Sequence, residues 1–156
     1  MNRMRLIGVG CDHGGYLLKE KLVTFLRSWG FSVMDAGAFS EASMDYPDTA
    51  ARVARAVSRG RVSRGILICK SGIGNSIVAN KFPGVRAALC YTVKTAKLSR
   101  RHNDANILVL GAMFVNEARM IKIVNAWIKE PFEGGRHLRR LKKIERIEDV
   151  CARKKR

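Results

Sequence analysis

The chain has 156 residues, of which 47% are apolar and 7% aromatic, which is enough to build the core of one ordinary domain. Its formal net charge of +17 suits either a small anionic substrate or a nucleic-acid surface and does not choose between them. No apolar run reaches the ~20 residues of a membrane span and the first residues show no signal-peptide pattern, so we expect a soluble, cytoplasmic protein. The four cysteines include no C-x-x-C pair, so we expect no disulfide framework.

Five short apolar runs alternate with five amphipathic segments along the chain. The runs cover residues 6–10, 31–36, 65–69, 85–91 and 107–111. Most are apolar throughout, which predicts strands buried on both faces, as in a parallel sheet. The segments with helical periodicity cover residues 16–29, 47–58, 75–82, 93–101 and 116–129. This alternation predicts a three-layer α/β fold with a five-stranded, mostly parallel sheet.

A sixth amphipathic segment follows at residues 137–153. Its apolar residues recur at every third position, namely Leu138, Leu141, Ile144, Ile147 and Val150. Because the five-unit sheet already looks complete, we expect this extra C-terminal helix to pack on a partner subunit rather than on its own domain. The sequence shows no internal repeat and no low-complexity linker, so residues 1–156 are expected to form a single domain.

The segment 69–76 is a glycine-rich turn between a predicted strand and a predicted helix. In open parallel sheets, chemistry is found beyond the carboxyl ends of the strands. Glycines let successive N–H groups converge on an anion, and the helix start adds partial positive charge. Cys69 would have its thiolate favoured by this field and by Lys70. The pattern alone also fits an ordinary turn with a buried cysteine.

Three further polar clusters lie at predicted element ends, and each has a plain structural alternative. Asp12 and the histidine after it follow the first strand, where Asp12 could simply cap the next helix. Residues 101–106 precede the last strand and could form an ordinary turn rich in Asn and Asp. Arg136 and Arg140 share one helix face, which suits a phosphate but also suits solvent.

Taken together, these blocks resemble the type-B ribose-5-phosphate isomerases, whose wider family includes the galactose-6-phosphate isomerase subunits. The blocks are Cys-Asp-His-Gly-Gly at 11–15, Asp-Tyr-Pro-Asp at 45–48, Ile-Leu-Ile-Cys-Lys-Ser-Gly-Ile-Gly at 66–74, Val-Arg-Ala-Ala-Leu-Cys at 85–90, Arg-x-His-Asn-Asp-Ala-Asn at 100–106 and Phe-Glu-Gly-Gly-Arg-His at 132–137. They occur in the expected order across nearly the whole chain. The resemblance implies a Rossmann-like sandwich, a homodimer or tetramer with each active site at the subunit interface, and no metal or organic cofactor.

The resemblance also implies catalytic roles. Cys69 matches the base that takes the C2 proton of the open-chain sugar, forms a cis-enediolate and helps return the proton to C1. Ser71 matches a residue that assists at the reacting oxygens, and His102 matches the residue that opens the furanose ring.

The resemblance assigns the remaining site residues to substrate binding. The backbone N–H groups of the anion hole belong to Lys70, Ser71, Gly72, Ile73 and Gly74. Asp12 and Asn103 match residues that bind sugar hydroxyls, and Tyr46 matches a residue that forms a wall of the pocket. Tyr46 could instead only stabilise the turn at the start of its helix. The phosphate clamp is matched by His13, Arg136 and Arg140.

Four positions depart from the family pattern. Lys70 stands where glycine is usual, Ser71 where threonine is usual, and Asn75 where an apolar residue is usual. Met113 replaces a common arginine that holds the phosphate, a contact worth about 1.5–3 kcal/mol. Lys70 could compensate, the pocket could suit another sugar phosphate, or activity could be weak.

The sequence therefore predicts an aldose–ketose isomerase of the pentose phosphate pathway that interconverts ribose 5-phosphate and ribulose 5-phosphate. The nearest alternative is the same reaction on allose or galactose 6-phosphate. An alternative from another class is a non-catalytic polyanion binder, which the charge favours and the intact set of site residues disfavours. We expect no membrane partner and no nucleic-acid partner.

Overall fold

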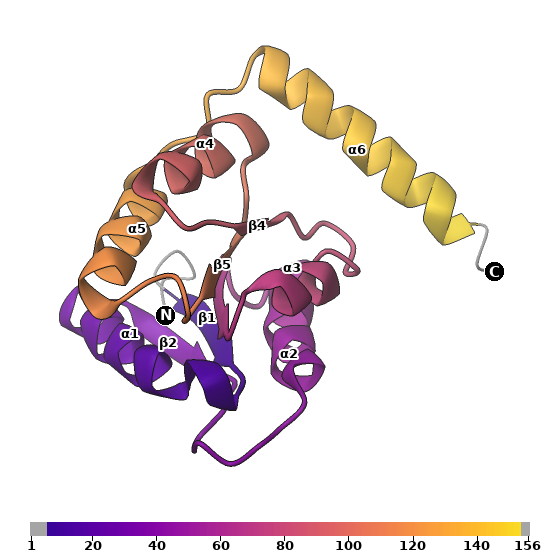
Figure 1. The fold of residues 1–156 in the computed structure, drawn as a ribbon. Helices are drawn as coiled ribbons and strands as arrows, with labels where there is room; N and C mark the ends of the chain where they lie inside the picture. Colours follow the sequence, from indigo (N-terminus) through magenta and orange to yellow (C-terminus); the bar gives the residue numbers. More distant parts are fainter. Residues whose placement is uncertain (1–5, 154–156) are drawn as a thin grey trace.

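The computed structural model describes residues 6–153, in which a five-stranded sheet lies between two layers of helices (Figure 1). The strands are β1 (Leu6–Cys11), β2 (Ser32–Asp35), β3 (Arg64–Cys69), β4 (Ala87–Leu89) and β5 (Ile107–Gly111). They lie in the order β2-β1-β3-β5-β4, and every pair is parallel. The predicted three-layer α/β fold is confirmed, with a sheet that is parallel throughout. The predicted domain's first five and last three residues lie outside the described part.

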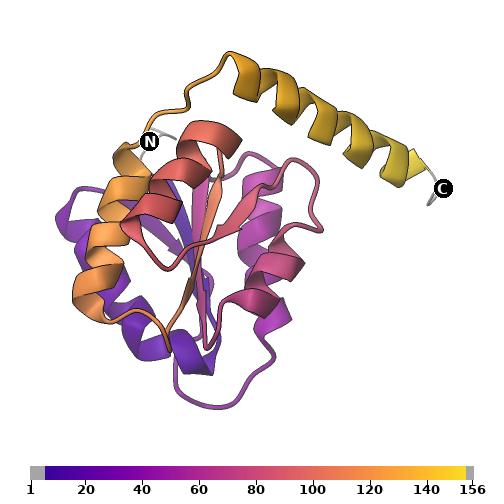
Figure 2. The same cartoon turned by 45° about the horizontal axis from the view of Figure 1, so that its top comes forward.

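Helices cover both faces of the sheet (Figures 1 and 2). One layer holds α1 (Tyr16–Ser28), α4 (Val93–Asn103) and α5 (Glu117–Lys129), and the other holds α2 (Tyr46–Ser58) and α3 (Ile73–Ala79). A short 3-10 turn, η2 (His13–Gly15), joins β1 to α1. Strand side chains alternate between the two layers, so that Ile66 and Ile68 pack with α1 and α5 while Leu67 packs with α2.

Local sequence signals fix where the helices begin and end. Thr92 forms a capping box with Thr95 at the start of α4, and Asn116 accepts a hydrogen bond from the Arg119 N–H at the start of α5. Asp104 stops α4 in the left-handed conformation, with φ of 43°.

Strand β4 is shorter than the predicted 85–91. It is an edge strand that pairs only with β5, and the Asn80 side chain bonds both the N–H and the C=O of Ala87 on its open side. A side chain therefore takes the place of a further strand along this edge.

The extra C-terminal helix α6 (Arg136–Arg153) runs along one side of the molecule, apart from the three layers (Figures 1 and 2). It is held by the buried Leu141 and by a 2.9 Å hydrogen bond from the Gly84 N–H to Glu148 Oε2. Its other apolar residues are exposed by about half: Leu138, Ile144, Ile147 and Val150. None of the helices in residues 6–153 has the length and apolar character needed to cross a bilayer.

Candidate active site

Cys69 is the last residue of β3 and lies at the carboxyl edge of the sheet, opposite Gly111 of β5. Its Sγ accepts a hydrogen bond from the Gly72 N–H at 3.1 Å. Gly72 has φ of +87°, and a Cβ there would overlap the Leu89 side chain. Only glycine therefore lets the chain turn back so tightly that its N–H groups meet the cysteine sulfur.

Two opposing effects act on the Cys69 thiol. Burial is the larger and raises its pKa above the ordinary 9.0, while the backbone N–H groups of Asn75, Gly72 and Ser71 lower it. The Asp12 carboxylate raises the pKa as well. The N–H groups of the turn thus favour the thiolate, as expected, but burial of Cys69, which is only 4% exposed, outweighs them and the pKa of the thiol is raised.

Hydrogen bonds from neighbouring elements hold the turn in place. The Tyr91 hydroxyl donates to the Ser71 C=O at 3.0 Å, and the N–H groups of Ala112 and Met113 donate to the carbonyls of Cys69 and Lys70. Sequence reasoning did not choose Tyr91 as a site residue. Its position at the end of the predicted strand 85–91, at the same edge as Cys69, is a signal that could have found it.

Asp12 and His13 lie beside this turn, at the end of β1. Asp12 is 7% exposed, and its Oδ1 accepts from the Gly15 N–H at 3.0 Å, so it does cap the 3-10 turn. His13 is exposed, and its Nδ1 accepts from the Met44 N–H at 3.3 Å. A neutral His13 ring would then carry its proton on Nε2.

Tyr46 opens α2 and covers the same turn. A Cβ built at Gly74 would lie 2.6 Å from the Tyr46 ring, so the missing side chain at Gly74 makes room for the ring. Tyr46 remains 40% exposed. It therefore stands as a wall beside the N–H groups that follow Cys69.

A second group of predicted site residues lies where α4 ends and α6 begins. His102 and Asn103 close α4, and Arg136 is the first residue of α6. The His102 ring stacks on His137, with centroids 4.2 Å apart and 7° between the planes. Glu133 Oε2 lies 3.9 Å from His102 Nε2 and 3.5 Å from His137 Nε2. Sequence reasoning missed Glu133 and His137, although both stand in the block Phe-Glu-Gly-Gly-Arg-His.

This second group could hold a cation, but its surroundings favour an anion. The ligand atoms of His102, Glu133 and His137 all lie within 4.8 Å of one another. Arg101 Nε, however, lies 3.8 Å from Glu133, and Arg136 Nε lies 3.5 Å from His137 Nε2. Burial, and then the neighbouring His102 and Arg136, lower the pKa of His137. The local field therefore suits a phosphate better than a metal ion.

The two groups lie at opposite ends of the strands: the first at the carboxyl ends, which form the carboxyl edge of the sheet, and the second at the amino ends, which form its amino edge. Cys69 ends β3, whereas His102 precedes β5, whose first residue Ile107 pairs with Gly65 near the start of β3. From Gly65 to Cys69 the strand rises about 13 Å at ~3.3 Å per residue. One chain thus brings together one part of the predicted site, namely Asp12, His13, Tyr46, Cys69, Lys70, Ser71, Gly72, Ile73 and Gly74. It places the other part elsewhere, namely His102, Asn103, Arg136 and Arg140.

Known sequences resemble nearly the whole chain. A family model described as Ribose/Galactose Isomerase matches residues 7–144. Ribose-5-phosphate isomerase B of Escherichia coli (strain K12) is 46% identical over 145 residues, which cover 93% of this chain and 97% of the relative. The probable ribose-5-phosphate isomerase B of Mycoplasma genitalium is 44% identical over 144 residues, 91% of this chain and 95% of the relative.

Solved structures give the same result. Ribose-5-phosphate isomerase B of Clostridium thermocellum superposes with a TM-score of 0.92 at 49% identity, covering 93% of this chain and 98% of that one. The Mycoplasma genitalium enzyme, solved with bound ribulose 5-phosphate, has a TM-score of 0.89 at 44% identity, covering 92% and 96%. The chain belongs to the ribose/galactose isomerase family.

Proposed function

We propose that this protein is an aldose–ketose isomerase that interconverts ribose 5-phosphate and ribulose 5-phosphate, with Cys69 as the base. The observation that carries the proposal is the Cys69 sulfur at the end of β3, which receives the N–H groups of the glycine-rich turn that follows it. The relatives that match nearly the whole chain are named for the same reaction.

The chemistry requires a base and an anion hole in one place. A C–H bond next to a carbonyl is a weak acid, so the enediolate must be stabilised while it forms. Backbone N–H groups that are already in place do this in a site poor in water, and one such donor is typically worth ~10²–10³ in rate. Ser71 belongs to the turn that follows the base, and its Oγ accepts a hydrogen bond from the Ile73 N–H at 3.3 Å.

The active site is completed by a second copy of the chain. Cys69 and its turn lie at the carboxyl edge, whereas His102 and Arg136 lie at the amino edge of the same sheet. Ring opening by His102 and a phosphate clamp of Arg136 and Arg140 can serve the enediolate chemistry at Cys69 only if they come from a partner. We therefore place each site between two subunits, in a dimer or a larger assembly of dimers.

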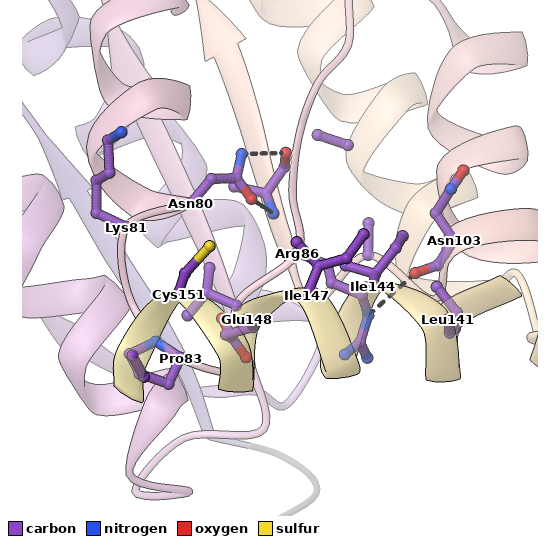
Figure 3. Close-up of a pocket in the computed structure, with 15 residues that line it drawn as sticks. Asn80, Lys81, Pro83, Arg86, Asn103, Leu141, Ile144, Ile147, Glu148 and Cys151 are labelled. Atoms are coloured by element: carbon purple, nitrogen blue, oxygen red, sulfur yellow. Dashed lines mark hydrogen bonds between the residues drawn. The ribbon is translucent and has the colours of Figure 1, made fainter. Parts of the chain in front are cut away.

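The exposed side of α6 is the surface that we assign to this contact. A groove of about 840 Å³ separates α6 from the body (Figure 3). Ile144 and Ile147 line it from α6 and are 50% and 64% exposed, and Asn80 and Arg86 line the opposite wall. A partner subunit that fills this groove would bury the apolar stripe and bring the residues at the start of α6 to the neighbouring Cys69.

Lys70 and Met113 lie side by side next to the turn that follows Cys69, because the Met113 N–H donates to the Lys70 C=O at 3.0 Å. Both side chains are exposed. The Lys70 ammonium is thus placed to supply the phosphate contact for which the resemblance implies an arginine at position 113.

The four cysteines are free, and three of them are buried. This usage suits a reducing compartment, and we propose the cytoplasm as the place of action.

The test is turnover of ribose 5-phosphate by the wild type beside Cys69→Ala. We expect turnover by the wild type and loss of at least about 10³-fold in kcat in the variant, because no other group stands in for the base. Allose and galactose 6-phosphate are assayed in parallel. A wild type that is inactive on ribose 5-phosphate but active on a six-carbon phosphate would contradict the substrate, and a fully active Cys69→Ala variant would contradict the base.

A further inference from the structure

Asn75 stands out among the buried residues. Its side chain is 0% exposed, and neither Nδ2 nor Oδ1 has a hydrogen-bond partner within residues 6–153. Buried side-chain amides are nearly always paired, and an unpaired one lowers the stability of the fold. Neither amide atom bonds another group of the described chain, so this side chain does not hold the fold together through hydrogen bonds. A polar group that costs stability and is not needed for folding is a candidate for a functional one.

Cys69 and Asn75 face the same layer of the molecule. Along β3, Gly65 and Leu67 face the layer of α2 and α3, and Cys69 is the next residue in that alternation. On α3, Asn75 and the buried Ala79 stand one turn apart, and Ala79 belongs to the core cluster shared with α2. Helical side chains tilt toward the helix start, which here means toward the turn that carries Cys69.

The Asn75 side chain also begins beside the sulfur, because the backbone N–H of Asn75 acts on Cys69 Sγ. A change in its χ1 and χ2 angles is the movement that would carry Nδ2 toward the sulfur. The other groups that face the thiol are few. Asp12, beyond β1, opposes the thiolate; Tyr46 of α2 covers the turn; and Lys70 points to solvent at its rim.

We propose that Asn75 is a positioning residue for Cys69, whose side-chain N–H donates to the thiolate when the thiol ionises. It adds a donor to the backbone N–H groups of Ser71, Gly72 and Asn75 itself. An amide that is unpaired next to the neutral thiol becomes paired when the charge appears, so it favours the ionised form. The purpose of this contact rests on the proposed function, but its chemical effect on Cys69 does not require turnover.

The test measures the reactivity of Cys69 with iodoacetamide across pH in the full chain, wild type beside Asn75→Leu. Alkylation is followed by mass on the peptide that contains Cys69, so that Cys11, Cys90 and Cys151 do not contribute. We expect the apparent pKa of Cys69 to rise by about one unit and alkylation near neutral pH to slow about tenfold. The Tm of the variant rises, because an unpaired buried amide is removed.

Asn125→Leu is the matched control. Asn125 lies on α5, on the other side of the sheet, and its Oδ1 is also buried without a partner in the described chain. This variant is expected to leave the Cys69 titration unchanged. Asn75→Ala serves as a second variant without added volume, so that a packing fault in Asn75→Leu does not decide the result.

Turnover supplies an independent readout. In both Asn75 variants we expect kcat to fall about tenfold with little change in KM, and the pH profile of kcat to move to higher pH. An unchanged Cys69 pKa in both variants, or an equal shift in Asn125→Leu, would overturn the proposal. If the wild type proves inactive on sugar phosphates while the pKa shift appears, the proposed function fails and the Asn75–Cys69 contact stands.

Discussion

At the residue scale, two cysteines at neighbouring strand ends show how position decides chemistry. Cys11 ends β1 and pairs in register with Ile68, so its side chain faces the layer of α1 and α5, away from that of Cys69. Burial raises the pKa of the Cys11 thiol to about 12, and Ala38 donates one N–H to its sulfur at 3.2 Å. Cys69 instead receives the N–H groups of a glycine-rich turn at the rim of the sheet. Burial raises the pKa of both thiols, but several N–H groups of one turn lower it at Cys69 and only one does so at Cys11.

The buried Cys11 thiol should make the protein less stable at high pH. The thiol loses its proton near pH 9.0 in the unfolded chain and near 12 in the folded one, so between these values the folded state holds a proton that the unfolded state has lost. The contribution of the Cys11 thiol to the free energy of unfolding is fully present below pH 9.0. Above pH 9.0 this contribution falls by about 1.4 kcal/mol per pH unit.

Urea denaturation at several pH values from 9 to 11 checks this prediction against Cys11→Ala. The variant is less stable at neutral pH because it leaves a cavity, but its stability should decline less steeply with pH. Parallel curves for the two proteins would mean that Cys11 does not titrate as its burial indicates.

At the scale of the elements, α6 differs from the other helices because most of its apolar stripe is left exposed within residues 6–153. Of the five apolar residues at three-residue spacing, only Leu141 is buried, at 4% exposure. A helix gains most of its stability from packing one apolar face, so α6 needs a surface to cover it. Its first residue is Arg136, which we place in the phosphate clamp. We therefore expect the packing of α6 on a partner subunit to be needed for both assembly and activity.

Ile147→Glu should separate the subunits and abolish activity together. The substitution puts a charge into an apolar contact, and it leaves the core untouched because Ile147 is 64% exposed. We expect sedimentation to show a monomer with native circular dichroism and a loss of at least about 100-fold in kcat/KM. Lys142→Glu, at an exposed polar position of the same helix, is the control and should stay assembled and active. An assembled, active Ile147→Glu protein would remove α6 from the interface.

At the scale of the whole molecule, the sheet separates the two parts of the site. The predicted site residues near Cys69 lie at the carboxyl edge and those near His102 at the amino edge, and β3 rises about 13 Å between Gly65 and Cys69. The two-fold assembly that we propose would solve this separation, because each subunit presents both edges and the pair can form two equivalent sites. Arg101 is paired with Glu130, so the guanidinium of Arg136, next to His137, is the charge that would meet an anionic substrate there.

Mixed assemblies test this arrangement directly. Cys69→Ala and His102→Ala are each expected to be nearly inactive alone. When the two variants are co-expressed, about half of the dimers contain one of each, and one of their two sites has both an intact Cys69 and an intact His102, so we expect about a quarter of wild-type activity. Activity no higher than that of the separate variants would show that each site is built within one chain.

Much of this protein is determined by its sequence alone. Continuous apolar runs of strand length, separated by helical periodicity, allow only a parallel sheet with helices on both faces, because such strands must be covered twice. The turn after Cys69 was also evident, since glycines next to a strand end are needed wherever N–H groups converge. The short β4 was not, because the Asn80 side chain that closes the sheet edge belongs to another element.

Only the tertiary structure decided the state of the thiol and the division of the site. Sequence proximity suggested that the helix start and Lys70 would ionise Cys69, but burial, which depends on every layer around the sulfur, has the larger effect. Likewise, the order of residues along the chain does not reveal that His102 lies at the opposite sheet edge. That follows from parallel pairing, which sends every strand start to one edge and every strand end to the other. The sequence thus determined the fold and the kinds of chemical groups, and three-dimensional packing determined which of them meet.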